Sequence, residues 1–159
     1  LQDGLRCVLA KTSHLKVKIL LETMAGQGTV LGARLELFRE VLEGLDWDER
    51  LGLCLDSCHL YAAGYEFRER SSYEHFARSL EKVFGLSRIG CWHLNDSRAE
   101  RGSLRDRHQH LGDGEVGLKF FSMILNDDRW EDVPLILETP KDGTGDAGNM
   151  ALLRKLRGY

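Results

Sequence analysis

The chain has 159 residues, of which 42% are hydrophobic and 30% charged, a composition that suits one globular domain with a buried core. Its 22 basic and 25 acidic residues give a formal net charge of −3, which excludes a strongly positive overall field, so any contact with nucleic acid must come from a local patch. The sequence contains no apolar run long enough to cross a bilayer and no signal-peptide pattern. Four scattered cysteines predict reduced thiols and a cytoplasmic protein.

Short aliphatic runs alternate with helical patterns along the chain. The opening residues, LQDGLRCVLAK, lack an initiator methionine and are typical of the end of a helix, so the chain is expected to be a fragment. Buried strands are predicted at residues 17–22, 51–56, 89–95 and 133–138. Apolar residues at helical spacing predict helices within residues 31–42, 73–83, 118–125 and 148–157. A strand followed by a helix, four times over, predicts an α/β fold with a parallel sheet.

Each predicted strand ends in a residue that can bind a metal or act in catalysis, and these residues are Glu22, Asp56, His93 and Glu138. In a barrel of parallel strands, the active site lies at the carboxyl ends of the strands, so we expect the four side chains to converge. The residue two positions earlier, which faces the same side of the sheet, is apolar or nearly so in each strand: Leu20, Cys54, Cys91 and Ile136.

Three carboxylates and a histidine in one poorly solvated cavity would repel one another without a cation. His59 in DSCH, together with Asp106 and His108 in the segment DRHQHLGDG (106–114), extends the set to seven oxygen and nitrogen ligands. Seven ligands are too many for one tetrahedral zinc, and imidazole argues against magnesium or calcium alone. The sequence therefore predicts a cluster of zinc-like ions, with the 106–114 segment as its most exposed part.

Four motifs, in order, resemble signatures of the endonuclease IV family of apurinic/apyrimidinic (AP) endonucleases: LLETMAGQG (20–28), GLCLDSCHLYAAGY (52–65), HLNDSR with DRHQHLGDGEVG (93–117) and LILETP (135–140). The resemblance extends from about Val17 to the final helix. It implies a xylose isomerase-like TIM barrel with three zinc ions. Residues 1–159 would then be the C-terminal portion of a single barrel domain, with four strand–helix units, and the N-terminal half would be absent.

The resemblance implies zinc-dependent hydrolysis of the DNA phosphodiester 5′ to an abasic site, in base excision repair, leaving a 3′-hydroxyl end. The partner would be double-stranded DNA with abasic sites, and the complete enzyme would be a monomer. Catalytic roles fall on Glu22 and Glu138. Glu22 resembles the glutamate that bridges two zinc ions, the second ion would be completed by Asp56, His93 and Glu138, and the third would be held by His59, Asp106 and His108.

Several residues of the same motifs are expected to contact DNA: Arg98, Arg101, Arg105, Arg107, Gln27 and Tyr65. The arginines could instead form a solvated face, paired with acids such as Asp96 and Asp113. This chain has Ser57 where the family usually has threonine, and Arg98 where it usually has lysine, which changes how a phosphate could be held. The two histidines that complete the first zinc site of the family have no counterpart here.

Two other functions stay open. A metal-dependent sugar isomerase or epimerase with the same barrel fold also ends its strands in Glu, Asp, His and Glu, but a small-sugar pocket would not require the arginines around residues 106–114. A catalytically inactive fragment is the other alternative. We expect residues 1–159 alone not to cleave abasic DNA, because four strands cannot close a barrel.

Overall fold

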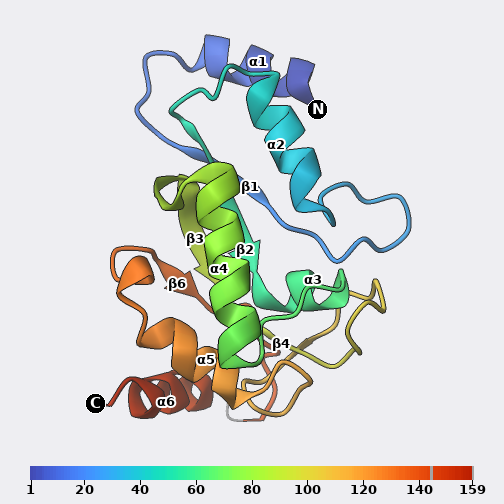
Figure 1. The fold of residues 1–159 in the computed structure, drawn as a ribbon, viewed down its shortest axis with the longest axis vertical. Coiled ribbons are helices and arrows are strands. Elements are labelled where there is room, and N and C mark those ends of the chain that lie inside the picture. Colours follow the sequence, from blue (N-terminus) through green and yellow to red (C-terminus); the bar gives the residue numbers. More distant parts are fainter. Residues whose placement is uncertain (144, 159) are drawn as a thin grey trace.

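Four parallel strands form the centre of the computed structural model, which describes residues 1–143 and 145–158 (Figure 1). The strands lie in the order β1-β2-β3-β6 and span Ile19–Glu22, Leu51–Asp56, Ile89–His93 and Leu135–Ile136, respectively. The α-helices are α1 (Gln2–Lys11), α2 (Leu35–Glu43), α3 (Ser57–Ala62), α4 (Arg70–Phe84), α5 (Leu118–Leu125) and α6 (Gly145–Arg157). Two 3-10 turns, Leu86–Arg88 and Asp128–Trp130, precede β3 and β6. The predicted parallel α/β arrangement is confirmed.

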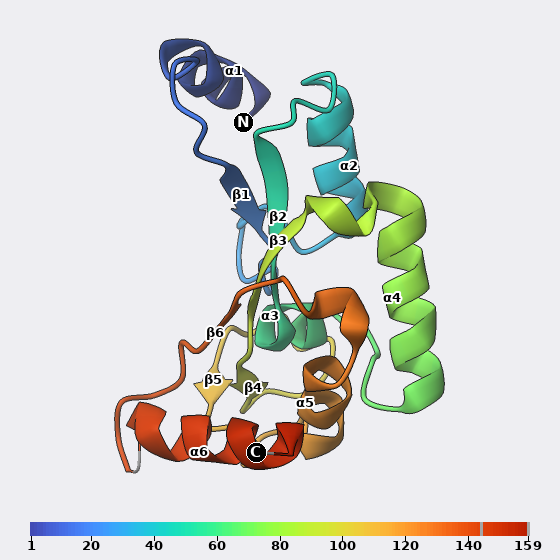
Figure 2. The ribbon, with the colours of Figure 1, turned by 90° about the vertical axis from the view of Figure 1, so that its left-hand side faces the viewer.

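One face of the sheet packs against helices. Alternate residues of β2, namely Leu51, Leu53 and Leu55, are fully buried in the same core as Trp92 of β3. Helix α4 adds a stripe at helical spacing, which consists of Tyr73, Phe76, Ala77, Leu80 and Phe84. Figure 2 shows α2, α4 and α5 along this side of the sheet. Burial of each large apolar side chain contributes about 1.5–3 kcal/mol, so this face anchors the strands that carry the site.

The opposite face of the sheet carries the side chains of alternate parity. Leu20 pairs with Gly52, Cys54 with Cys91, and the register shifts by one residue at Gly90 between β2 and β3. A Cβ atom on Gly90 would lie 2.5 Å from Leu20 Cδ2, so a larger residue at this bulge would force the Leu20 side chain to move. The side chain of Ile136 at the β6 edge is 46% exposed, whereas Cys54 and Cys91 in the middle of the sheet are 5% exposed.

Some predicted boundaries are wrong. The strand predicted at 133–138 is only two residues long, since β6 pairs with β3 alone and Pro134, which lacks an N–H group, precedes it. The helix predicted from residue 31 begins at Leu35, after Gly32 with φ of 102°. Helix α3 and the antiparallel pair β4 (Asp96–Ser97) and β5 (His108–Gln109) were not predicted.

The carboxyl ends of the central strands point toward α3 and the β4–β5 pair (Figures 1 and 2). The opening helix α1, predicted from the sequence as a helix end, packs beside α2 at the other end of the sheet, where Gln2 Nε2 donates to Glu40 O at 3.0 Å. In the described part of the chain, no helix combines the length and the apolar character needed to span a bilayer.

Candidate metal centre

The seven predicted ligands lie in two adjacent groups at the carboxyl ends of the strands. We call Glu22, Asp56, His93 and Glu138 the strand-end group, and His59, Asp106 and His108 the loop group. Within each group, one ligand atom from every residue lies within 4.8 Å of the others. The structure therefore brings the four strand-end residues together, as expected, although β6 itself ends two residues before Glu138.

His93 lies at the centre of the strand-end group. Its Nδ1 atom is 3.1 Å from Glu22 Oε1, 3.0 Å from Glu138 Oε2 and 3.7 Å from Asp56 Oδ2. The Asp56 side chain is fully buried, and the Glu138 side chain is 46% exposed. The site offers three carboxylate oxygens and one imidazole nitrogen, which are ligand types that zinc binds, and it is open on the Glu138 side.

The loop group has the spacing of a tetrahedral site. His59 Nε2 lies 3.3 Å from both His108 Nε2 and Asp106 Oδ1, and His108 Nε2 lies 3.4 Å from Asp106 Oδ1. Two ligand atoms that each lie about 2.0–2.1 Å from a tetrahedral zinc ion are about 3.3–3.4 Å apart. The three atoms therefore fit one zinc ion with its fourth position open.

Backbone carbonyls hold both histidines of the loop group in one tautomer. His59 Nδ1 lies 2.8 Å from Thr23 O, and His108 Nδ1 lies 2.9 Å from Glu138 O. A carbonyl oxygen only accepts hydrogen bonds, so each Nδ1 donates a proton to its carbonyl, and Nε2 is the nitrogen that could bind an ion. Support of this kind fixes the ring orientation and strengthens metal binding. Thr23 is a supporting residue that the sequence did not reveal.

Asp56 couples the two groups. Its Oδ1 atom accepts the His59 N–H at 2.8 Å as the N-cap of α3, and its Oδ2 atom accepts from Asn95 Nδ2 at 2.6 Å. Asn95 Oδ1 in turn accepts the Glu138 N–H at 2.8 Å. The motif DSCH thus places a strand-end ligand and a loop-group ligand three residues apart, because one caps the short helix on which the other lies.

Electrostatics in the strand-end and loop groups favour a bound cation. Hydrogen bonds from His59 and His93 lower the pKa of Glu22 to about 2. Burial lowers the pKa of His59, but the hydrogen bond to Glu22 and the charges of Asp56 and Asp106 outweigh it and raise the pKa to about 9. The hydrogen bond to Glu22 also raises the pKa of His93. The carboxylates therefore favour positive charge on both imidazoles, and a bound cation would take the place of their added protons.

Asp96 organises the loop that carries the metal ligands. Its carboxylate is fully buried and accepts the N–H groups of Ser97 and Val116 at 2.8 Å and of Gly112 at 2.9 Å, with longer contacts to Gly114 and Gly117. The interpretation of Asp96 as a surface partner of the arginines is therefore wrong. Its position in HLND, directly after a buried strand, was the one sequence signal for this role.

The four arginines predicted to contact DNA all lie exposed on the segment that joins β4 to β5: Arg98, Arg101, Arg105 and Arg107. Arg101 Nε lies 3.5 Å from Glu66 Oε2, and Arg107 Nη1 donates to Asp106 O at 2.5 Å. Backbone hydrogen bonds from Gly102 N to Tyr61 O and from Leu104 N to Ala62 O attach this segment to α3. The segment thus carries four exposed arginines beside α3, and Arg107 contacts the backbone of Asp106 in the loop group.

Gln27 and Tyr65 have different surroundings. Gln27 is exposed and its Oε1 atom accepts the Asp106 N–H at 3.4 Å, which places it at the rim of the loop group. The Tyr65 hydroxyl accepts the Leu35 N–H at 2.9 Å, and its ring lies 5.8 Å from the ring of Phe76. Tyr65 therefore connects the start of α2 to α4, and its hydroxyl already has a partner in the protein.

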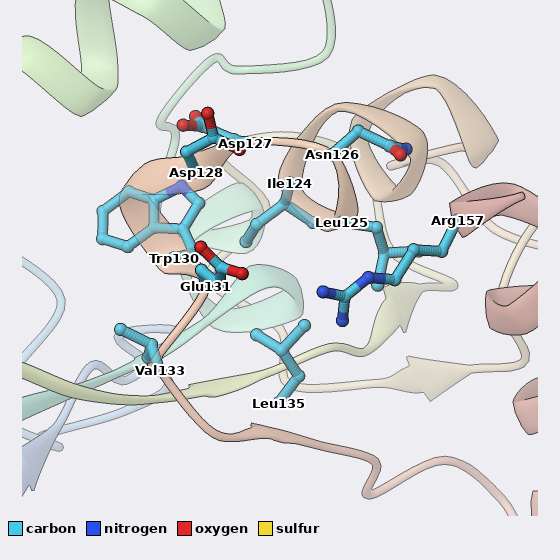
Figure 3. Close-up of a pocket in the computed structure, with 10 residues that line it drawn as sticks. All are labelled: Ile124, Leu125, Asn126, Asp127, Asp128, Trp130, Glu131, Val133, Leu135 and Arg157. Atoms are coloured by element: carbon cyan, nitrogen blue, oxygen red, sulfur yellow. The ribbon is translucent and has the colours of Figure 1, made fainter.

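A hollow of about 540 Å³ lies elsewhere, between α5, β6 and the end of α6 (Figure 3). Its walls include Ile124, Trp130, Leu135 and Arg157. None of the seven candidate ligands lines this hollow. It is therefore separate from the metal centre.

Comparison with known proteins agrees with this geometry. Residues 1–157 match a family described as xylose isomerase-like TIM barrels. The chain belongs to this family. It is 46% identical over 156 residues to a probable endonuclease 4 of Chloroflexus aurantiacus and 44% identical over 156 residues to one of Chloroflexus aggregans. These alignments cover 97% of this chain but 55% and 54% of the relatives. The chain thus spans about half the length of the curated relatives it matches.

A solved structure supports the same assignment. Endonuclease IV from Thermus thermophilus superposes with a TM-score of 0.83 at 34% sequence identity, over 98% of this chain and 55% of that chain. The resemblance to the endonuclease IV family is confirmed, and so is the xylose isomerase-like fold, here as a partial barrel.

Proposed function

We propose that this chain contributes the strand-end group and the loop group to a zinc-dependent AP endonuclease, which hydrolyses the DNA phosphodiester 5′ to an abasic site and leaves a 3′-hydroxyl end. The observation that carries the proposal is the loop group, in which three ligand atoms have the separations of a tetrahedral zinc site. The names of the relatives, probable endonuclease 4, and of the Thermus thermophilus structure, endonuclease IV, supply the reaction.

The two groups would hold two of the three zinc ions of the complete enzyme. Bound zinc would supply Lewis acidity and lower the pKa of a water molecule to about 7. Glu22 would orient ligands of both groups, since its Oε1 atom is 3.1 Å from His93 Nδ1 and 3.4 Å from His59 Nδ1. Glu138, half-exposed at the mouth of the strand-end group, would face the substrate phosphate. The exposed arginines and Gln27 would bind flanking phosphates of double-stranded DNA.

We further propose that residues 1–159 are the C-terminal portion of one barrel domain. The sheet has four strands in the described residues, a complete barrel has eight, and the relatives are about twice as long as the matched region. The remaining ligands of the first zinc ion would then come from the other half. A complete enzyme of this kind would be a cytoplasmic monomer, which suits four free cysteines.

A fusion of the N-terminal half of the Chloroflexus aurantiacus relative to residues 1–159 tests the function. We expect the fusion to incise a duplex with one abasic analogue on the 5′ side of the lesion, and to lose this activity after chelation of its metal. We expect residues 1–159 alone to be inactive on the same duplex. Gel analysis of end-labelled strands distinguishes incision 5′ to the lesion from incision elsewhere.

Glu138→Ala in the fusion is expected to reduce incision by at least about 100-fold, because it removes a ligand of the strand-end group. Glu81→Ala, which changes an exposed glutamate in the last turn of α4, is the matched control and should leave the rate unchanged. A folded, zinc-loaded fusion that incises no abasic duplex but isomerises a small sugar would contradict the proposal. Incision that survives Glu138→Ala would contradict the role of this residue.

The arginines give a separate prediction. Replacing Arg105 with alanine in the fusion should weaken DNA binding and reduce the slope of log affinity against log salt concentration by up to about 0.9, because each phosphate contact releases a counterion. Arg39→Ala, on the exposed side of α2, should change neither quantity. Fluorescence anisotropy of a labelled abasic duplex across a salt series measures both. An unchanged slope for Arg105→Ala would mean that this arginine belongs to a solvated face.

A further inference from the structure

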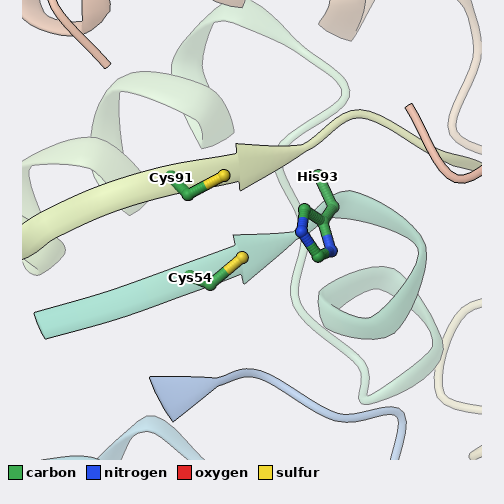
Figure 4. Close-up of side chains that lie close together, drawn as sticks. All are labelled: Cys54, Cys91 and His93. Atoms are coloured by element: carbon green, nitrogen blue, oxygen red, sulfur yellow. The ribbon is translucent and has the colours of Figure 1, made fainter. Parts of the chain in front are cut away.

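Two buried thiols lie directly behind the strand-end group, on the same face of the sheet. Cys54 of β2 and Cys91 of β3 are paired in register, two residues before Asp56 and His93, respectively. Each cysteine is 5% exposed, and both are free thiols. In Figure 4 both sulfur atoms point along their strands toward the ring of His93. Neither cysteine has a role in the function proposed above.

The geometry of these three side chains is close to that of a metal site. The two sulfurs and a ring nitrogen of His93 all lie within 4.8 Å of one another. Two thiolates that each lie about 2.3 Å from a tetrahedral ion are about 3.8 Å apart. Small side-chain movements would therefore bring the three ligand atoms around one ion, with the fourth position left for a small ligand.

We propose that Cys54, Cys91 and His93 form a binding site for a thiophilic d¹⁰ cation of the cadmium class, next to the strand-end group, with which it shares His93. Binding replaces the two thiol protons, which pass to solvent, so the site changes from two neutral thiols to two thiolates with one divalent cation. No electron transfer is involved. We call these three residues the thiol group.

Ligand chemistry separates the thiol group from its neighbours. The strand-end and loop groups each offer carboxylate oxygens and imidazole nitrogens, which suit zinc. Two sulfur ligands favour softer ions, because thiolates bind polarisable cations most strongly. His93 belongs to both the strand-end group and the thiol group. A soft ion on the thiols would therefore engage a ligand on which the strand-end group depends, and cadmium would lower zinc retention there.

The test is a cadmium titration of the reduced, zinc-loaded chain, followed by ultraviolet absorption. Only sulfur coordination produces a thiolate-to-cadmium charge-transfer band, so cadmium in the oxygen-rich groups remains silent. We expect the band to saturate at about one cadmium ion per chain. Cys54→Ser and Cys91→Ser should each reduce the band at saturation by about half or more, because each removes one of two sulfur ligands.

The chain supplies its own controls. Cys7→Ser changes an exposed thiol on α1 and should keep the full band. Cys58 lies with Asp56 and His108 in another possible metal site, so the titration is repeated in Cys58→Ser, where the band from the thiol group should remain. A band that survives when Cys54→Ser or Cys91→Ser is made in the Cys58→Ser background, or that disappears in Cys7→Ser or Cys58→Ser alone, would overturn the proposal.

Cadmium NMR of the unmodified chain gives a reading that does not depend on how the variants fold. A signal in the sulfur-coordinated region of the spectrum is expected, and its absence from cadmium-saturated protein would also overturn the proposal. Neither measurement uses DNA cleavage, so the thiol group and the proposed nuclease function can fail independently.

Discussion

Replacing His108 with alanine is expected to remove one of about two zinc ions that the chain binds at its two oxygen-rich groups. His108 Nε2 is 3.3 Å from His59 Nε2 and 3.4 Å from Asp106 Oδ1, so its loss leaves two protein ligands in the loop group. Zinc affinity at that group should fall by at least about 100-fold, since even the loss of a supporting residue costs 10- to 100-fold. Elemental analysis after equilibrium dialysis measures the change in zinc content.

His75→Ala is the matched control for His108→Ala, because His75 is exposed on α4 and outside all of the candidate groups. Its zinc content should equal that of the parent chain. Equal zinc content in His108→Ala and the parent would show that the loop group does not bind an ion. A parallel loss in His75→Ala would point to a general effect of histidine removal.

Asp96→Ala is expected to lower the free energy of unfolding by about 3–5 kcal/mol, through the loss of one buried acceptor for several backbone donors. The Asp96 carboxylate receives the N–H groups of Ser97, Gly112 and Val116 within 2.9 Å, and no other described side chain accepts from them in the structure. Urea unfolding, followed by circular dichroism, measures the change through the midpoint and the slope.

Asp96→Asn refines the same prediction. The asparagine keeps one oxygen acceptor, but its amide NH₂ group faces N–H donors that need an acceptor. The free energy of unfolding of Asp96→Asn should therefore lie between those of Asp96→Ala and the parent. Asp113→Ala, an exposed acid in the same loop, should remain within about 0.5 kcal/mol of the parent. A stability of Asp96→Ala similar to that of Asp113→Ala would mean that the buried acceptor contributes little to the fold.

The strands and the convergence of their carboxyl ends could be predicted from the sequence. Runs such as LGLCLD and IGCWHLN show by their own apolar residues that they are buried strands. Each run is short, apolar and followed by a ligand, and parallel strands bring their carboxyl ends to one edge. The same reasoning placed Asp56 and His93 together, and the structure pairs them across β2 and β3. The structure places the seven candidate ligands in two groups, and their binding of zinc stays a prediction.

What the sequence did not reveal depends on contacts between distant segments. Thr23 accepts a hydrogen bond from His59 through its backbone carbonyl. Every residue has such a carbonyl, so the type of side chain at position 23 does not predict this contact. Asp96 lies among other charged residues in the sequence, which favoured a surface position. It is buried because backbone N–H groups about 16 to 20 residues later in the chain, at Gly112 and Val116, donate to its carboxylate. The short strand β6 ends early because it is an edge strand, a property of sheet order rather than of the run VPLILE.

The scattered origin of the strand-end ligands has a consequence for how the protein acquires metal. Glu22, Asp56, His93 and Glu138 come from separate units of the chain, so no short segment of the unfolded polypeptide can bind an ion at this group. Parallel pairing of β1, β2, β3 and β6 must come first, and such non-local pairing is intrinsically slow. Zinc bound at this group, as we propose, would therefore act late: it would retard unfolding of a sheet that has already formed, rather than accelerate its formation.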